Sequence, residues 1–417
     1  MLQLGLVAGV ALAQDVGGLP AKFVRENLRE SFDAASLQRI VNNLPTDLEV
    51  ASWSARDDHY HVVFSDGSSG EFYMPGDEIE ELEDEARVLW EDPAVVEGLM
   101  GRDWKEGGIS VDWAELGVEV TEAAGGVTET LNQGRARIPM AVVKARAALL
   151  RAVHVYGIAK VRNGPASPDA CVRLVDAVVG AVQTSVFGYK FVIKAVENPV
   201  NLAFDNVGLK QHTDNPYQAK TPDVGVFHCI SPAPRGGESL WLDGFAAAEA
   251  LDEKDKQVLA DTPVMHLEIS DKWDLRATHP TLEYRDGKLE HVYFNERTRD
   301  SWRQYSRTKE PPSPAFYKAL RTFESLVDDR ARMLVTPLRA GDIALFDNSR
   351  VMHSRQAFQG GRHMEGTYME WHSIYATYRS LYARIVGNNP MTYCGNNITL
   401  PVDDNDSEEF PYHPREL

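Results

Sequence analysis

The chain has 417 residues, 43% of them hydrophobic, so it can bury a large core and has room for one large domain and a smaller one. Its formal charge of −19, from 43 basic and 62 acidic residues, argues against nucleic acid or an anionic membrane as the main partner. Three cysteines, none of them at C-x-x-C spacing, exclude a cysteine-rich zinc site and favour a reducing compartment, which indicates a cytoplasmic protein.

The start of the chain is apolar from Leu2 to Ala13, as the core of a signal peptide would be. No basic residue precedes Lys22, however, and a signal peptide begins with a positively charged region. We therefore expect a packed first segment rather than an export signal. No run in the chain approaches the length that spans a bilayer, so no membrane partner is expected.

Residues 1–110 are predicted to form a small N-terminal α+β domain. Its strands are expected at three short runs, Leu48–Ser54, His59–Ser65 and Gly70–Met74. Asp66–Gly70 supplies the hairpin turn between the last two runs. The acidic stretch at Asp77–Glu85, which we expect on the surface, and the following Ala86–Trp90 are predicted to be helical.

Residues 111–417 are predicted to form the second, larger domain. Its helices are expected at Met140–Val155, Pro168–Val178, Phe245–Ala260 and Pro314–Met333. Its strands are expected at Ala159–Val161, Gly225–Ile230, Glu238–Leu242, Val264–Ile269, Glu290–Phe294, Asp342–Phe346 and Arg350–Ser354. Many short strands separated by Gly and Pro turns indicate a sandwich or jelly roll, so the predicted fold class is mainly β with helical insertions.

Two separated motifs contain metal-binding side chains, His212-Thr213-Asp214 and His353. His-x-Asp followed by a distant His is the ligand set of the facial triad, which holds Fe(II) by three groups and leaves three positions open. On an extended strand His212 and Asp214 would point to the same face, so His353 must come from another strand. A chain with 12 histidines produces His-x-Asp by chance, so the surrounding motifs decide the assignment.

Four longer motifs carry a specific resemblance. They are Gln211–Tyr217 (Gln-His-Thr-Asp-Asn-Pro-Tyr), Gly225–Cys229 (Gly-Val-Phe-His-Cys), Gly236–Leu251, which begins Gly-Gly-Glu-Ser, and Gly341–Ser354, which contains Phe-Asp-Asn-Ser-Arg and ends Val-Met-His-Ser. Together they resemble the gamma-butyrobetaine dioxygenase and trimethyllysine dioxygenase family, within the taurine-dioxygenase-like group of Fe(II)/2-oxoglutarate oxygenases. The resemblance covers roughly residues 140–385 and implies a double-stranded β-helix (jelly roll) core.

The resemblance implies that His212, Asp214 and His353 hold Fe(II), with 2-oxoglutarate and O2 as co-substrates and no catalytic side chain beyond the metal centre. Arg362 matches the arginine that binds the far carboxylate of 2-oxoglutarate, a task suited to a bidentate guanidinium. Arg355 competes for this role, because on a strand it would share the iron-facing side with His353. We favour Arg362, since Gly360-Gly361 permit a turn before it. The hydroxyl that assists the carboxylate matches Ser239.

The resemblance also implies a substrate pocket, at Phe187, Phe191, Asn201, Phe204, Asn295 and Tyr368. The family surrounds a trimethylammonium group with an aromatic box, and Trp and Tyr faces attract a cation better than Phe. Here the three upstream aromatic positions are Phe and only Tyr368 has a hydroxyl, which leaves an apolar cup. The alternative is that the three Phe side chains are ordinary core residues. His228, His363 and His372 are interpreted as core or supporting histidines.

The family's small N-terminal domain usually carries a zinc bound by three Cys and one His. Residues 1–110 contain no Cys, although Leu48–Pro75 resembles the strands of that domain. We therefore predict an N-terminal domain without this zinc, held by its apolar core, with a homodimer partner as further support.

The expected function is oxidation of an unactivated C–H bond in a small aliphatic amino acid, by hydroxylation, desaturation or ring closure such as aziridine formation from valine. Such a reaction belongs in the biosynthesis of secondary metabolites. The alternative within the enzyme class is hydroxylation of a trimethylammonium substrate such as gamma-butyrobetaine or trimethyllysine. An inactive relative that acts as a binding protein is the alternative from another class. The sequence leaves the exact substrate, the type of oxidation and the oligomeric state open.

Overall fold

The computed structural model describes residues 15–16, 18–32, 39, 44–56, 59–73, 82–118, 138–194 and 206–386. Contacts divide the chain into two units, Met1–Glu80 with Tyr382–Leu417, and Glu81–Leu381. Residues 81–110, assigned from the sequence to the small domain, therefore pack with the larger unit. The physical reason is visible at β6 (Ser110–Asp112), which pairs in parallel with β7 (Ile158–Arg162) in the main sheet.

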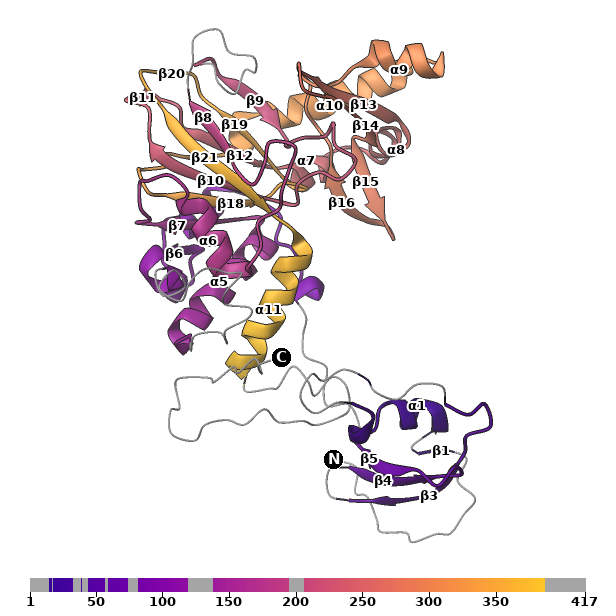
Figure 1. Ribbon diagram of the computed structural model, residues 1–417. Coiled ribbons are helices and arrows are strands. Elements are labelled where there is room, and N and C mark those ends of the chain that lie inside the picture. The colour runs from indigo at the N-terminus through magenta and orange to yellow at the C-terminus, as the bar shows by residue number, and fades with distance from the viewer. Residues whose placement is uncertain are drawn as a thin grey trace. The chain divides into compact units, whose positions relative to one another are not determined.

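The smaller unit contains a three-stranded antiparallel sheet and a short helix (Figure 1). Its elements are β1 (Asp15–Val16), β2 (Leu19–Pro20), α1 (Ala21–Glu26), β3 (Val50–Ala55), β4 (Tyr60–Phe64) and β5 (Ser69–Phe72). The Asp66 carboxylate accepts a hydrogen bond from the Ser68 backbone at 2.9 Å, which closes the predicted hairpin turn. Val24, Leu28 and Phe64 belong to one buried cluster, so this unit has a core of its own.

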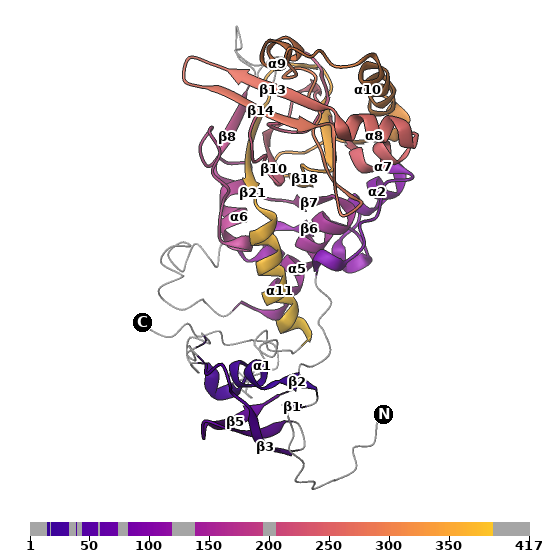
Figure 2. The ribbon, with the colours of Figure 1, turned by 90° about the vertical axis from the view of Figure 1, so that its right-hand side faces the viewer.

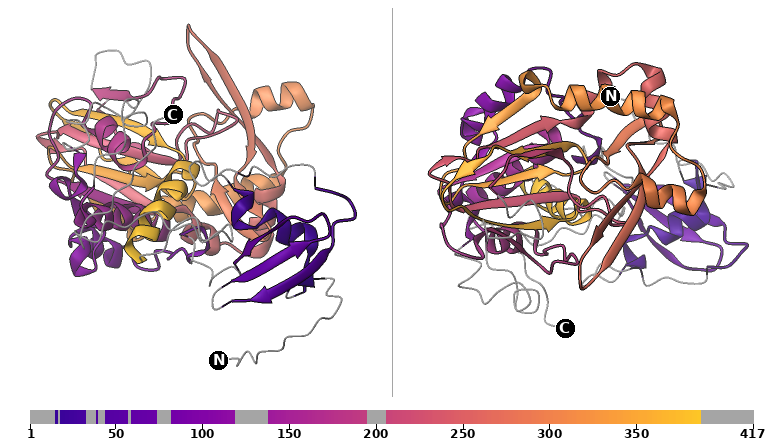
Figure 3. Two further views of the ribbon diagram at one scale, coloured as in Figure 1. Left: turned by 60° about the horizontal axis from the view of Figure 1, so that its bottom comes forward. Right: turned by 90° about the horizontal axis from the view of Figure 1, so that it is seen from above.

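Two sheets form the centre of the larger unit. The six-stranded sheet runs β6-β7-β18-β10-β21-β8, with the further strands β8 (Phe191–Lys194), β10 (Val224–Ser231), β18 (Ile343–Asp347) and β21 (His363–Met369). The four-stranded sheet runs β17-β12-β19-β9, from β9 (Leu209–His212), β12 (Ser239–Asp243), β17 (Met333–Thr336) and β19 (Val351–Arg355). Figures 1 and 3 show both sheets.

Aromatic side chains join the two sheets face to face. The ring centroids of Trp241 on β12 and Phe346 on β18 lie 5.0 Å apart, and those of Phe227 on β10 and His353 on β19 lie 5.1 Å apart. The sheets therefore enclose a buried layer of side chains, as expected for a sandwich. A mainly β core with helical insertions is the architecture that the sequence predicted.

Helices cover the six-stranded sheet from outside. α5 (Met140–Tyr156) contacts β7 and β18, and α6 (Ala170–Val179) contacts β10 and β21. A further long helix, α11 (Trp371–Val386), directly follows β21. Among the described residues, no helix has both the length and the apolar character required to cross a bilayer.

A large insertion separates β12 from β17. It contains α7 (Gly244–Glu249), α8 (Glu253–Asp261), β13 (Pro263–Ile269), β14 (Asp274–Pro280), β15 (Leu282–Arg285), β16 (Lys288–Val292), α9 (Ser301–Thr308) and α10 (Pro314–Val327). Phe245, Leu259 and Phe323 belong to its buried core, and Figure 2 shows the β13–β14 hairpin with α9 and α10. This insertion brings the segment after β16 to the functional site.

Two predicted helices differ from those in the structure, one by an internal break and the other by an earlier end. Phe245–Ala260 is two helices rather than one, because the Asp252 carboxylate caps α8 by accepting a hydrogen bond from the Asp255 backbone at 2.7 Å. Pro314–Met333 is helical only to Val327, since Met333 already begins β17.

The predicted helix at Ala86–Trp90 is wrong. The backbone N–H of Val88 donates to the Val155 carbonyl at 2.8 Å, and that of Trp90 donates to the Asp243 carboxylate at 3.0 Å. Asp243 also forms a buried ion pair with Arg350 at 2.7 Å. Tertiary partners therefore replace helical hydrogen bonds here, and the same ion pair fixes the start of β19, the strand that carries His353.

Candidate metal centre

Pairing of β9 with β19 brings the three predicted ligands together. His212 is the last residue of β9 and lies opposite His353 on β19. The Nε2 atoms of His212 and His353 lie 3.8 and 3.5 Å from Oδ1 of Asp214. One ligand atom from each residue lies within 4.8 Å of the others. Asp214 follows the end of β9 instead of extending it, so the triad comes from strand register and not from alternation along one strand.

Long-range hydrogen bonds hold the Asp214 loop. The side chain of Asn348 accepts from the Asp214 backbone N–H at 2.7 Å and donates to its carbonyl at 3.2 Å. The Thr213 backbone N–H donates to the Phe294 carbonyl at 2.8 Å. The Tyr368 hydroxyl donates to Oδ2 of Asp214 at 3.1 Å, which orients the carboxylate. Asn348 had not been singled out from the sequence, although the Phe-Asp-Asn-Ser-Arg motif contains it.

The electrostatics of the triad suit a divalent cation. Burial, followed by the neighbouring His353, lowers the pKa of His212 to about 3, so this imidazole is neutral at physiological pH. Burial opposes ionisation of Asp214, but His353, His212 and the Tyr368 hydroxyl together lower its pKa to about 2. Nδ1 of His212 lies 2.9 Å from the Lys210 carbonyl oxygen and so carries the proton, which leaves Nε2 as the donor atom.

The residues therefore fit Fe(II). Two neutral imidazoles and one ionised carboxylate are the donor set of mononuclear Fe(II) sites with open positions.

Arg362 and Ser239, the predicted 2-oxoglutarate residues, line one cavity of about 260 Å³. The Arg362 guanidinium has no ion pair among the described residues, lies 5.9 Å from the Phe358 ring centroid, and has its pKa lowered by burial. Ser239 lies opposite Arg355 on the β12–β19 pair, two residues from the position opposite His353. An unpaired, largely buried guanidinium that faces a cavity is suited to an anionic ligand.

Arg355 is already engaged. It is buried, its Nη2 donates to the Val207 carbonyl at 2.8 Å, and its guanidinium lies 4.8 Å from the Phe358 ring centroid. These contacts occupy the competitor, so the geometry supports the preference for Arg362 as the carboxylate-binding arginine.

The predicted substrate wall divides in the structure. The ring centroids of Phe191 and Tyr368 lie 5.2 Å apart, whereas Phe187 packs against Trp273, which had not been predicted, at 5.5 Å. Gly366 makes room for Phe191, because a Cβ there would meet the ring at 2.2 Å. Tyr368 therefore borders the metal centre, with its hydroxyl directed to Asp214 rather than free for substrate, and Phe191 lies beside the Tyr368 ring.

The remaining predicted pocket residues have different outcomes. Asn295 is buried, and its side-chain oxygen accepts a hydrogen bond from the Arg297 backbone at 3.2 Å. Asn201 and Phe204 lie outside the described residues.

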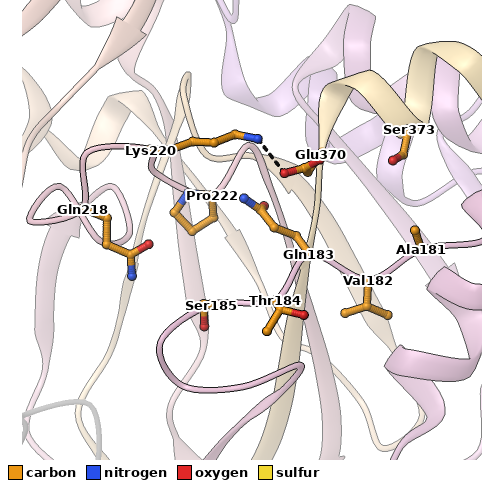
Figure 4. A pocket seen from close by; sticks show the side chains of 10 residues that line it. All are labelled: Ala181, Val182, Gln183, Thr184, Ser185, Gln218, Lys220, Pro222, Glu370 and Ser373. Atoms are coloured by element: carbon orange, nitrogen blue, oxygen red, sulfur yellow. Dashed lines mark hydrogen bonds and ion pairs between the residues drawn. The ribbon is translucent and has the colours of Figure 1, made fainter. Parts of the chain in front are cut away.

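A second cavity, of about 320 Å³, lies beside the end of β21 (Figure 4). Gln183 on its wall donates a backbone hydrogen bond to the Tyr368 carbonyl at 2.8 Å, and an ion pair of 2.5 Å joins Lys220 to Glu370. No predicted site residue lines this cavity, so it is separate from the one that contains Arg362.

Comparison with known proteins places these residues in a family context. Residues 133–368 match the family described as "Taurine catabolism dioxygenase TauD, TfdA family". The chain is 30% identical over 250 residues to "Dioxygenase str8" of Strobilurus tenacellus, covering 54% of this chain and 57% of that protein. It is 28% identical over 222 residues to gamma-butyrobetaine dioxygenase of Homo sapiens, covering 51% of this chain and 57% of that protein. The resemblance inferred from the motifs is confirmed.

The similarity is partial in length. The chain spans only a little over half of these curated relatives, including trimethyllysine dioxygenase of Meyerozyma guilliermondii, which is 28% identical over 225 residues and covered to 55%, with 51% of this chain. A solved structure of asparagine oxygenase with Fe(II), 3-hydroxyasparagine and succinate matches 63% of this chain and 93% of its own, at 15% identity and a TM-score of 0.43.

Proposed function

We propose that this chain, which belongs to the TauD, TfdA family of dioxygenases, is an Fe(II)- and 2-oxoglutarate-dependent oxygenase with a jelly-roll core. The observation that carries the proposal is the convergence of the triad, in which Nε2 of His212 and of His353 lies 3.8 and 3.5 Å from the Asp214 carboxylate, with His212 held neutral by burial. His212 and His353 would hold the metal by Nε2, and Asp214 by its carboxylate.

The bound metal, with 2-oxoglutarate and O2, supplies an oxidant strong enough for an unactivated C–H bond, while 2-oxoglutarate becomes succinate and CO2. The protein contributes binding and orientation. Arg362 would neutralise the far carboxylate of 2-oxoglutarate, and Tyr368 would keep Asp214 in place by its hydrogen bond. Burial and Asp214 raise the pKa of Tyr368, so its hydroxyl remains a donor. No side chain needs to act as an acid or base.

For the substrate, we favour a small aliphatic amino acid. Phe191 lies beside the ring of Tyr368, which borders the metal centre, and a Phe ring keeps full apolar burial while attracting a cation less than Trp or Tyr. The competing proposal is a trimethylammonium compound, because relatives of this chain are gamma-butyrobetaine and trimethyllysine dioxygenases. Either substrate is a small molecule.

Turnover separates these proposals. L-Valine, L-isoleucine and gamma-butyrobetaine would each be supplied with Fe(II), 2-oxoglutarate and O2, while succinate formation and substrate consumption are measured together. Coupled consumption of an amino acid supports the proposal. Consumption of gamma-butyrobetaine alone would establish the betaine alternative, and an iron-loaded protein without 2-oxoglutarate turnover would indicate an inactive binding relative.

A further inference from the structure

The segment after β16 runs antiparallel to β13 and brings two charged residues to the same end of the pair. The Leu267 backbone N–H donates to the Thr298 carbonyl at 2.8 Å, and His266 forms a bridge with Arg299. Glu268 is the residue after Leu267, and Arg297 is the residue before Thr298. The two side chains therefore leave the paired segments at one end.

The same segment is attached to the metal centre. Phe294 exchanges hydrogen bonds with Thr213, the residue between the two ligands of the first motif, at 2.8 and 3.1 Å. Asn295 then forms a turn in which its side chain accepts from the Arg297 backbone at 3.2 Å and its carbonyl accepts from Thr298 at 3.1 Å. Arg297 is thus three residues from a direct backbone contact with the ligand loop.

Some charged side chains in this region form an ion pair and others do not. Glu296 and Arg299 form an ion pair with each other at 2.6 Å. Arg297 and Glu268, by contrast, have no side-chain hydrogen bond or ion pair within the part of the chain that the structure describes. Arg297 is exposed and Glu268 is half-buried, so a ligand can reach both. Burial lowers the pKa of Arg297, whereas Asp214 and Glu268 both raise it, so these charges lie within electrostatic reach of one another.

Arg297 and Glu268 influence the pKa of groups in and next to the triad. Burial raises the pKa of Tyr217, Glu268 and Asp214 raise it further, and Arg297 lowers it. The Tyr217 hydroxyl donates to the Asn215 side chain at 2.7 Å, beside the Asp214 ligand. Arg297 also contributes to the lowered pKa of His212. The pair of charges therefore lies within electrostatic reach of the residues that would surround a substrate.

We infer that Arg297 and Glu268 form a subsite for the charged head of a free α-amino acid, with Arg297 binding the carboxylate and Glu268 the ammonium group. A guanidinium presents two parallel donors to a carboxylate, and a primary ammonium donates hydrogen bonds to a carboxylate side chain. A quaternary ammonium has no N–H group, so Glu268 attracts it by charge alone. The inference rests on the proposed function and specifies its substrate class.

The test measures binding to the full chain loaded anaerobically with Fe(II) and 2-oxoglutarate, through the shift of the visible charge-transfer band. Three probes separate the two charges: L-valine, L-valinamide, which lacks the carboxylate, and 3-methylbutanoate, which lacks the ammonium group. The wild type should bind L-valine at least on the order of tenfold more tightly than either analogue, since each charge-assisted contact is lost with its group.

The variants assign each preference to a residue. Arg297→Gln should erase the preference over valinamide and keep that over 3-methylbutanoate, whereas Glu268→Gln should do the reverse. Arg297→Lys should restore part of the carboxylate preference. The matched control is the double variant Glu296→Gln/Arg299→Gln, which removes one charge of each sign from the same region and should bind like the wild type.

Formation of the Fe(II)–2-oxoglutarate band separates the two levels of the argument. If neither the wild type nor any variant forms the band, the proposed function fails. If the band forms but L-valine does not shift it, or if Arg297→Gln keeps the full preference for the carboxylate, the amino-acid subsite is contradicted while the proposed function stands.

Discussion

Among the described residues of the larger unit, two largely buried clusters contain metal-binding side chains, and they differ in whether the protein already compensates the charge of their carboxylate. They are the triad, His212, Asp214 and His353, and the Cys171 cluster, Cys171, His228 and Glu365. In each cluster the ligand atoms lie within 4.8 Å of one another. Distance alone therefore does not distinguish a metal centre from a packed polar core.

In the Cys171 cluster the protein itself compensates the carboxylate charge. Glu365 accepts from the Asp169 backbone at 2.8 Å and pairs with Lys190 at 3.3 Å. Nε2 of His228 bonds to the Pro165 carbonyl at 2.9 Å, and burial raises the pKa of the Cys171 thiol to about 12. A protonated thiol is a poor metal ligand, and so is a carboxylate whose charge is already paired with a lysine.

The triad has the opposite character. No Lys or Arg side chain forms an ion pair with Asp214 among the described residues, its pKa is lowered to about 2, and its carboxylate accepts a hydrogen bond from the neutral Tyr368 hydroxyl. A buried anion needs a compensating positive charge, which Lys190 supplies in one cluster and which we assign to Fe(II) in the other. The comparison teaches that available charge, not proximity, marks the metal site.

The largest expected effect breaks the triad. His212→Ala or His353→Ala should abolish coupled succinate formation and remove iron while the fold is retained, because each removes one of the three metal ligands. Asp214→Glu should also fail, because a longer carboxylate displaces the metal from its geometry. Turnover and metal content of each purified variant provide the measurement. His228→Ala is the control and should keep its iron; a His353→Ala variant as active as the wild type would rule out the triad.

Arg362→Ala sharpens the comparison at the co-substrate cavity. Loss of a buried charge-assisted contact should weaken 2-oxoglutarate binding by about 2–5 kcal/mol. The Michaelis constant for 2-oxoglutarate should rise far more than that for the prime substrate. Arg355→Ala is the matched variant, and if it produced this phenotype while Arg362→Ala did not, the carboxylate would be bound by Arg355.

Tyr368→Phe removes the hydroxyl that donates to the Asp214 carboxylate while keeping the ring. Because groups that orient metal ligands contribute to affinity, Fe(II) binding should weaken by about 10- to 100-fold. Competition with a calibrated chelator measures this affinity. Phe191→Leu, which alters the wall without touching Asp214, should leave it unchanged; equal losses in both variants would mean that Tyr368 acts through packing alone.

The smallest effect concerns the Cys171 cluster. Lys190→Met leaves Glu365 without its cation and should reduce the free energy of unfolding by about 1–2 kcal/mol, with iron content unchanged. Lys210→Met is the control, because its ion pair with Asp328 is exposed and should contribute under about 1 kcal/mol. Denaturant unfolding measures both. If Lys190→Met lost its iron while its stability stayed unchanged, the metal would be bound by the Cys171 cluster rather than by the triad.

The sequence predicted much of the site because its motifs keep their residues close to the strands that position them. The motifs and the family resemblance point to His212, His353, Ser239 and Arg362, and the structure pairs the two histidines and places the other two residues on one cavity. The predicted reason for their convergence, that His212 and Asp214 share one face of a strand, is only partly correct. Asp214 lies beyond β9 and is held by Asn348 across 134 residues of sequence. Spacing along the chain cannot show a partner so distant.

Other features depended on tertiary contacts in the same way. Ala86–Trp90 is extended because Val155 and Asp243 bind its backbone, which local propensity does not reveal. Phe187 packs against Trp273 from the insertion, so its neighbour could not be read from its own segment. The break before α8, however, had a local signal, the capping residue Asp252. The predicted absence of zinc in the N-terminal domain stays a prediction.

The most direct test of the central claim is anaerobic titration of the full chain with Fe(II) in the presence of 2-oxoglutarate, followed by visible charge-transfer absorption. We expect one equivalent of Fe(II) to saturate the band in the wild type and in Cys171→Ala, and no band in His353→Ala. A band that survives in His353→Ala and disappears in Cys171→Ala would place the metal in the other cluster and contradict this account.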